Sequence, residues 1–72
     1  MAHKFTVCRI GVEWAVRDAT GALYAISTKL SATCDAADVL ARRTGGRIAL
    51  TREAQERLAS LGLADRYPTN ED

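Results

Sequence analysis

The chain has 72 residues, of which 47% are apolar and 26% are charged, and its formal net charge is +1. These values exclude a disordered chain and a strongly basic nucleic-acid binder, and no apolar run approaches the roughly 20 residues of a membrane-spanning helix. One domain is expected, with a core that is only just sufficient at this length, so a homodimer is compatible with the sequence.

The first predicted strand, residues 4–10, is followed by a change in the phase of the apolar pattern. Phe5 lies at an odd position and Trp14 at an even one, so one continuous strand would place them on opposite faces of a sheet. A type II′ turn at Gly11-Val12 brings both onto one face, because its first central position favours glycine. A bulge at Gly11 within one long strand is the alternative. The turn predicts the pairs Ile10–Glu13, Arg9–Trp14 and Val7–Val16.

The second and third strands are predicted to form a hairpin around a type I turn. Asp18 and Gly21 occupy its first and fourth positions, where aspartate caps its own backbone and glycine closes the loop. The turn places Asp18 opposite Ala22 and predicts the further pairs Val16–Tyr24 and Trp14–Ile26. One face of the resulting meander then carries the large apolar side chains, Phe5, Val7, Trp14, Val16, Tyr24 and Ile26. The opposite face carries Thr6, Cys8, Ala15, Arg17, Leu23, Ala25 and Ser27, and it either stays wet, is covered by the last helix or docks a partner.

A helix is predicted over residues 34–44 and is expected to pack on the sheet. Thr33 is its expected N-cap, Asp35 and Asp38 suit its positive end, and Gly45-Gly46 ends it. Its predicted buried stripe consists of Ala36, Val39 and Leu40, with the stem of Arg43 as a further candidate.

A short fourth strand over residues 47–50 is expected to place Ile48 and Leu50 beneath that helix. A second helix over residues 52–61 follows, with Thr51 as its N-cap. Its apolar positions are Ala54, Leu58 and Leu61, and Gly62 with Leu63 suits a helix stop with a returning hydrophobic contact. We expect one domain over residues 1–63 and a flexible tail over residues 64–72.

These elements predict an α+β domain of order βββαβα. Its antiparallel four-stranded sheet consists of a three-strand meander and one returning strand, with one helix packed on it and a second helix at the C-terminus. The hairpin start Trp14-Ala-Val-Arg, the helix end Ala41-Arg42-Arg43-Thr44-Gly45-Gly46 and the strand Arg47-Ile-Ala-Leu resemble small uncharacterised bacterial domains with a hairpin–helix–strand core. The resemblance covers residues 5–50 and implies a fold more than a function, and the second helix departs from it.

No set of residues in the chain suggests catalysis, so we expect no enzyme, no metal and no cofactor. The one histidine, His3, lies in a predicted frayed end, and the two cysteines lack CxxC spacing. A helix start favours a lowered thiol pKa for Cys34, and a plain structural cysteine is the preferred interpretation. Free thiols and a start, Met-Ala-His-Lys, without the apolar core of a signal peptide indicate a cytoplasmic protein.

Two classes of function fit these observations. The first is a non-catalytic module for protein–protein interaction, either an adaptor or an inhibitor of the kind that phages and mobile elements encode, including the anti-CRISPR type. Its predicted contact residues are Ala15, Arg17, Leu23 and Ala25. The alternative is nucleic-acid binding through a cluster at one end of the molecule, because arginine forms bidentate contacts with phosphates. The cluster consists of Arg42, Arg43, Arg47 and Arg52, for which a solvated rim is the plainer interpretation.

Overall fold

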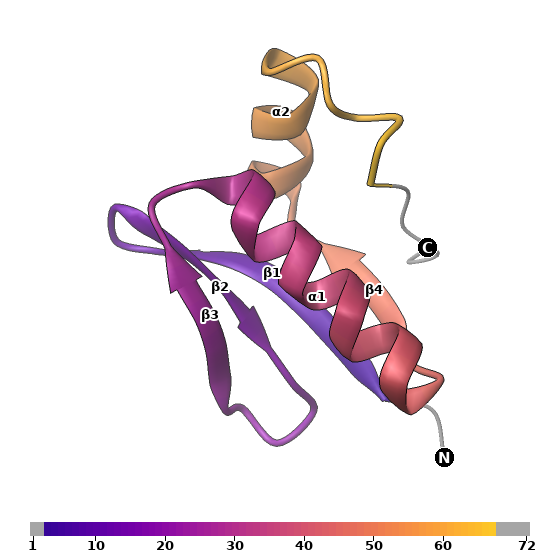
Figure 1. Cartoon of the computed structure of the whole chain (residues 1–72). Helices are drawn as coiled ribbons and strands as arrows, with labels where there is room; N and C mark the ends of the chain where they lie inside the picture. The colour runs from indigo at the N-terminus through magenta and orange to yellow at the C-terminus, as the bar shows by residue number, and fades with distance from the viewer. Residues whose placement is uncertain (1–2, 68–72) are drawn as a thin grey trace.

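The computed structural model describes residues 3–67, in which six elements follow one another in the order βββαβα (Figure 1). The strands are β1 (Lys4–Ile10), β2 (Glu13–Arg17), β3 (Leu23–Ser27) and β4 (Arg47–Leu50), and the helices are α1 (Leu30–Thr44) and α2 (Arg52–Ser60). The predicted α+β class and order of elements are confirmed. Neither helix has the length and apolar character needed to cross a membrane.

The sheet is mixed, so the prediction of an antiparallel sheet is wrong. Its strand order is β3-β2-β1-β4, and β4 pairs with β1 in parallel while the other two pairings are antiparallel. Helix α1 carries the chain across one face of the sheet, from β3 at one edge to β4 at the other (Figure 1). Its 15 residues span about 22 Å at 1.5 Å per residue. Such a helical crossover delivers the next strand parallel to the strand before it, which explains the direction of β4.

The turn between β1 and β2 follows the prediction. The register contains the pairs Ile10–Glu13, Arg9–Trp14 and Val7–Val16. Gly11 has a φ of 63°, whereas Val12 stays outside the positive-φ region, as a type II′ turn requires. The bulge alternative is wrong, because two separate strands pair with each other across this turn.

The loop between β2 and β3 is organised by the carboxylate of Asp18. Gly21 N donates to Asp18 O at 3.1 Å, which closes the predicted turn. Oδ1 accepts from the Thr20 hydroxyl at 2.6 Å and from the backbone N–H groups of Thr20 and Ala22, and Oδ2 accepts from the Tyr24 hydroxyl at 2.9 Å. Led by the Thr20 hydroxyl, these donors lower the pKa of Asp18 to about 2. The strands leave this loop with the pairs Arg17–Leu23 and Val16–Tyr24, the second of which was predicted.

The lowered pKa of Asp18 predicts that its carboxylate stabilises the fold and that protonation in acid removes this stabilisation. A carboxyl group whose pKa is 3.8 when unfolded and about 2 when folded stabilises the fold above pH 4, and this stabilisation is lost as the pH falls toward 2. We therefore expect Asp18→Asn to be less stable than the wild type at pH 6, with a gap that shrinks between pH 4 and pH 2. Urea unfolding at several pH values measures this gap, and a constant gap would contradict the assignment.

A β-bulge at Ala25 changes the register of the remaining part of the hairpin. Trp14 pairs with Ser27, so the predicted pairing of Trp14 with Ile26 is wrong. Ala25 has a φ of 53°, and Ala25 and Ile26 together fill the space of one residue opposite the neighbouring strand. Ile26 is 52% exposed and Tyr24 is 43% exposed, so neither joins the core as predicted.

Helix α1 begins at Leu30, earlier than the predicted start at residue 34, and it turns a different face to the sheet. Thr33, the predicted N-cap, is fully buried, and its hydroxyl donates to Ala25 O at 3.0 Å. A bulged residue is left out of the strand ladder, which leaves its carbonyl available to this hydroxyl. The prediction for Val39 is wrong, since it is 48% exposed, whereas Leu40 packs against the core and Ala36 is half-buried. The buried residues of α1 are Leu30, Thr33, Cys34, Ala37 and Ala41.

Helix α2 packs into the same core as α1. The Thr51 hydroxyl accepts from Ala54 N at 3.3 Å, which confirms the predicted N-cap. Leu63 N donates to Leu58 O at 2.8 Å, and the Leu63 side chain packs against the core, as predicted for the hydrophobic contact after the helix stop. Leu61, predicted on the apolar side of the helix, is 53% exposed, so this prediction is wrong. The core comprises Phe5, Val7, Trp14, Val16, Leu30, Cys34, Ala37, Ala41, Leu50, Ala54 and Leu58, with Leu40, Ile48, Leu63 and Tyr67 packed against it. Residues 68–72 of the predicted tail lie outside the described residues.

Candidate functional site

The sheet face that points away from the core is the first candidate surface, and we call it the outer face. Strand residues alternate between faces, so the neighbours of the core residues belong to it. Its strand positions are Lys4, Thr6, Cys8, Ile10, Glu13, Ala15, Arg17, Leu23, Ile26, Arg47 and Ala49. Both described helices pack on the other side of the sheet. Ile10, Leu23 and Ile26 are 41%, 41% and 52% exposed. The outer face thus presents apolar side chains to its surroundings.

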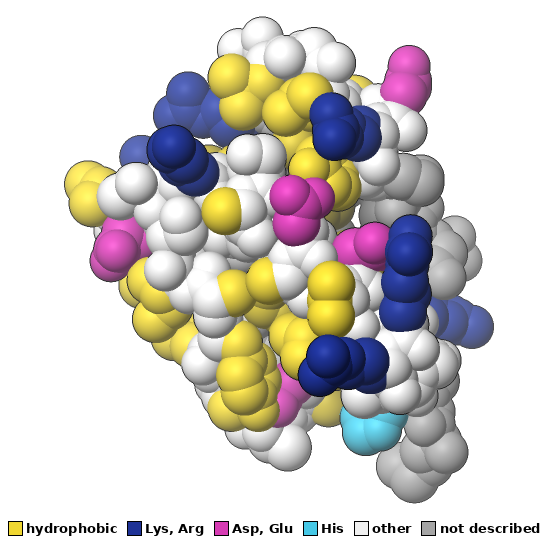
Figure 2. Space-filling model, in the orientation of Figure 1, with side chains coloured by type: hydrophobic (Ala, Val, Ile, Leu, Met, Phe, Trp, Pro, Cys, Tyr) yellow, Lys and Arg dark blue, Asp and Glu magenta, His cyan; other side chains and the backbone are white. Residues whose placement is uncertain are grey.

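The four residues predicted to contact a partner all lie on β2 and β3. Leu23 and Arg17 form a pair and are exposed, and Ala25 is exposed at the bulge. Ala15 is fully buried and contributes no accessible side-chain surface. Sequence reasoning missed Ile26, because the bulge moves its side chain from the predicted core face to the outer face. Figure 2 views the molecule from the side of α1, so the hydrophobic side chains that it shows beside β3 are seen from that side and the outer face is on the far side.

The four arginines of the predicted cluster lie at both ends of β4. Arg42 and Arg43 are in the last turn of α1, and Arg47 starts β4 nearby. Arg52 begins α2 beyond the other end of β4, five positions and about 16 Å from Arg47 along an extended chain. The structure therefore brings three of the arginines toward one end of the molecule and places the fourth elsewhere. Two of the four form ion pairs one helical turn apart, Arg42 with Asp38 at 3.1 Å and Arg52 with Glu56 at 3.5 Å.

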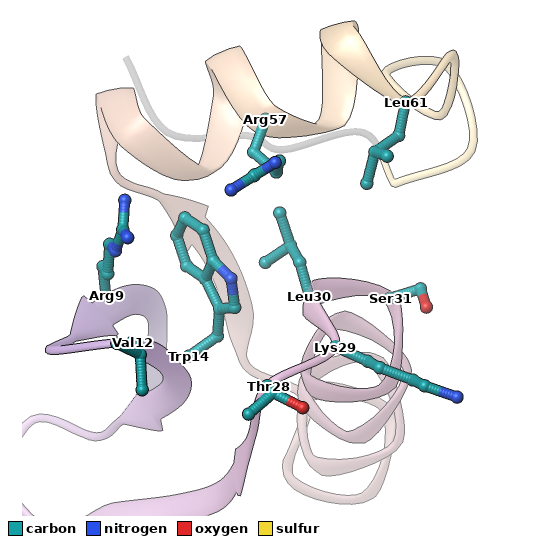
Figure 3. A pocket seen from close by; sticks show the side chains of 9 residues that line it. All are labelled: Arg9, Val12, Trp14, Thr28, Lys29, Leu30, Ser31, Arg57 and Leu61. Carbon is teal, nitrogen blue, oxygen red and sulfur yellow. The ribbon is translucent and has the colours of Figure 1, made fainter.

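A cavity of about 310 Å³ opens between the start of α1, helix α2 and the turn after β1, and we call it the Trp14 pocket (Figure 3). In the close-up the guanidinium groups of Arg9 and Arg57 lie near the indole of Trp14, while Leu30 and Leu61 point into the space beside it. The lining residues are Arg9, Val12, Trp14, Thr28, Lys29, Leu30, Ser31, Arg57 and Leu61. The pocket combines apolar walls with cationic groups from two distant segments.

The cations of the Trp14 pocket outnumber the acids around it. Arg9 lies with its guanidinium carbon 5.8 Å from the indole ring centre, donates from Nε to Gly11 O at 2.9 Å and pairs with Glu53 at 3.6 Å. Arg57 and Lys29 form no ion pair within residues 3–67. The ammonium group of Lys29 points away from the cavity, so Arg57 supplies the unpaired charge closest to the indole (Figure 3).

The indole N–H of Trp14 faces the Trp14 pocket without a partner. Trp14 is only 4% exposed, and its N–H forms no hydrogen bond to the described residues. Every fully buried side-chain nitrogen or oxygen in that part of the chain has a partner, so this N–H is not fully buried. Figure 3 shows the nitrogen on the cavity side of the ring, toward Leu30. The pocket therefore contains an unused, directed donor in its floor.

The start of α1 adds further donors to the Trp14 pocket. The N-cap residue, Lys29, contributes no side-chain hydrogen bond, and the first turn holds no acidic residue. A helix start of this kind leaves backbone N–H groups and the positive end of the helix dipole available to an anion. Sequence reasoning missed this feature, because it placed the helix start at Cys34, beside Asp35 and Asp38.

Neither cysteine has the properties of a reactive thiol. Cys8 and Cys34 are free and buried, as the sequence predicts. Burial, and secondarily the nearby charge of Asp35, raises the pKa of Cys34 to about 11, so the lowered pKa considered for a helix start is wrong. Among residues 3–67, no three His, Cys, Asp or Glu side chains are grouped so as to hold a metal ion.

Comparison with protein-family models, curated proteins and solved structures found no match to the chain. The resemblance to bacterial hairpin–helix–strand domains therefore stays a prediction. The two candidate surfaces, the outer face and the Trp14 pocket, rest on the geometry and charge of this chain alone.

Proposed function

We propose that the protein is a non-catalytic binding module that docks another protein on its outer face. The observation that supports this is a set of three exposed apolar side chains, Ile10, Leu23 and Ile26, on a sheet face that no described helix covers. Cys8 and Ala15 lie paired between them, and both are buried. Single exposed apolar residues are ordinary, but a group on one flat face is typical of a contact surface.

The charges of the outer face favour an acidic partner over a second copy of the chain. Arg17 and Arg47 stand against Glu13, so two positive charges and one negative charge leave an excess of +1. Packing two such faces together would bring like charges close to each other, which is costly at an interface. A protein with an apolar patch and an acidic rim avoids that cost.

An adaptor or an inhibitor, including one encoded by a phage or mobile element, works through such a contact without any catalytic group. We place it in the cytoplasm, because two buried free thiols, Cys8 and Cys34, suit a reducing compartment. Nucleic-acid binding through Arg42, Arg43 and Arg47 is the competing function, and it predicts an affinity that falls steeply with salt.

The test compares Ile26→Glu with Val39→Glu in co-purification from the source cells, quantified by mass spectrometry. The two side chains are exposed to 52% and 48%, but Val39 lies on α1, on the opposite side of the sheet. Burying a charge in an apolar contact costs free energy. We therefore expect the amount of protein that co-purifies with Ile26→Glu to fall by more than about tenfold. Val39→Glu should retain it.

Three results would contradict the proposal. The first is a protein retained by Ile26→Glu, and the second is one lost equally from both variants. The third is recovery of nucleic acid alone, released by salt and by Arg43→Ala. Circular dichroism of both variants verifies that the fold is intact. If the wild type is a dimer and Ile26→Glu is a monomer, the outer face binds a second copy of the chain and not an acidic partner.

A further inference from the structure

We propose that the Trp14 pocket is a binding site for a phosphate monoester carried by a small organic molecule or side chain. This inference goes beyond the outer face, because the pocket opens on the side of the sheet that α1 and α2 cover. It rests on three independent observations. These are a cavity between elements, the guanidinium groups of Arg9 and Arg57 near the indole, and an indole N–H that has no partner among the described residues.

The donors around the pocket come from four segments. Arg57 comes from α2, points toward the indole and has no ion pair within the described chain, while Arg9 approaches from β1. Trp14 contributes its N–H from β2, and the start of α1 contributes backbone N–H groups that no side chain caps. Glu53 and Glu56 lie beside Arg9 and Arg57, but Glu53 already pairs with Arg9 at 3.6 Å and Glu56 with Arg52 at 3.5 Å. The charge of Arg57 is therefore not neutralised by an ion pair within the described chain.

The number of donors favours phosphate over carboxylate. A carboxylate offers two oxygens, whereas a phosphate monoester offers three strong acceptor oxygens and nearly two negative charges near neutral pH. Arginine binds such groups through paired N–H donors, and helix starts bind them through backbone N–H groups. Two guanidinium groups, an indole N–H and a helix start therefore match phosphate better.

The apolar wall indicates that the phosphate belongs to a larger molecule. Leu30 and Leu61 point into the cavity beside the indole (Figure 3). The volume of about 310 Å³ lies at the small end of ligand pockets, and it exceeds what a bare phosphate fills. A compact organic body next to the phosphate would contact these leucines.

The test uses Trp14 itself as the probe, since it is the one tryptophan of the chain. Its single indole N–H resonance in a ¹H–¹⁵N spectrum is followed during titration with inorganic phosphate, and with acetate at matched ionic strength. We expect a saturable shift with phosphate and none with acetate. Removal of one charge-assisted hydrogen bond in Arg57→Gln should weaken phosphate binding by about tenfold or more.

The matched control is Arg66→Gln, which removes the same charge from a residue that does not line the Trp14 pocket and should leave phosphate binding unchanged. Arg57 and Arg66 are both exposed, so neither variant is expected to unfold. Equal phosphate affinity in Arg57→Gln and the wild type would overturn the proposal, as would equal shifts with acetate and phosphate, or a shift that never saturates. A nucleoside monophosphate and a phosphoserine peptide then separate the sources. The compound with the higher affinity identifies the organic body. If neither compound binds more tightly than inorganic phosphate, the role of the apolar wall is refuted.

Discussion

Leu58→Ala is expected to destabilise the protein by about 2 to 5 kcal/mol, the usual range for a buried leucine that leaves a cavity. Leu58 is 1% exposed and is among the largest fully buried side chains of the core. It is the larger of the two side chains that α2 buries in the core, the other being Ala54. A domain of this size has a total stability on the order of 5 to 15 kcal/mol, so the variant should unfold at a much lower denaturant concentration than the wild type.

Leu61→Ala provides the control for this experiment. Leu61 follows the same helix but is 53% exposed, so its truncation should change the free energy of unfolding by no more than about 0.5 kcal/mol. Urea unfolding of both variants, followed by circular dichroism, measures the difference. Equal midpoints for the two variants would mean that α2 is not part of the cooperative fold. That result would favour a domain ending near residue 50, where the resemblance to hairpin–helix–strand domains ends.

Features that depend on a few neighbouring residues could be predicted from the sequence. The turn at Gly11, the loop closed by Asp18 and Gly21, and the cap at Thr51 each follow from the chemistry of one to four adjacent side chains. The register of β1 with β2 follows in turn from the first of these turns. Local turn chemistry therefore determines the register of β1 with β2 and the position of the loop between β2 and β3.

Features that depend on distant residues could not be predicted. The apolar pattern of the four-residue strand β4 is the same in either direction, so its parallel pairing follows from the helical crossover through α1 and not from its own residues. The bulge at Ala25 depends on Thr33, whose hydroxyl takes the Ala25 carbonyl as its partner. That contact also explains the early start of α1, because Thr33 serves as an anchor inside the helix and not as its cap.

The Trp14 pocket likewise combines features that could be predicted from the sequence with features that could not. Sequence reasoning identified Trp14 as a core residue and paired it with Arg9, and both statements hold. The polar edge of the indole becomes visible only when Arg57, from α2, and the uncapped start of α1 are placed around it. No periodic pattern links these segments, so the pocket is a product of tertiary packing.

Gly46→Ala is expected to destabilise the protein by about 2 to 3 kcal/mol, because an added methyl group has no space. Its Cβ would lie 2.5 Å from His3 O and 3.1 Å from Phe5 Cε2. The first contact is with backbone, so β1 would have to move away from the start of β4. That movement would break the hydrogen bond that Arg47 N donates to His3 O at 2.7 Å.

The neighbouring glycine supplies the control for this steric argument. Gly45 has a φ of 69° and open space around the position of a Cβ, so Gly45→Ala meets only the cost of a left-handed backbone, about 1 kcal/mol. Hydrogen exchange separates the two mechanisms. The Arg47 amide should lose protection in Gly46→Ala and keep it in Gly45→Ala. The contrary result is that both variants lose the same stability and keep the Arg47 amide protected. In that case β1 and β4 leave room for a methyl group at position 46, and the steric argument is wrong.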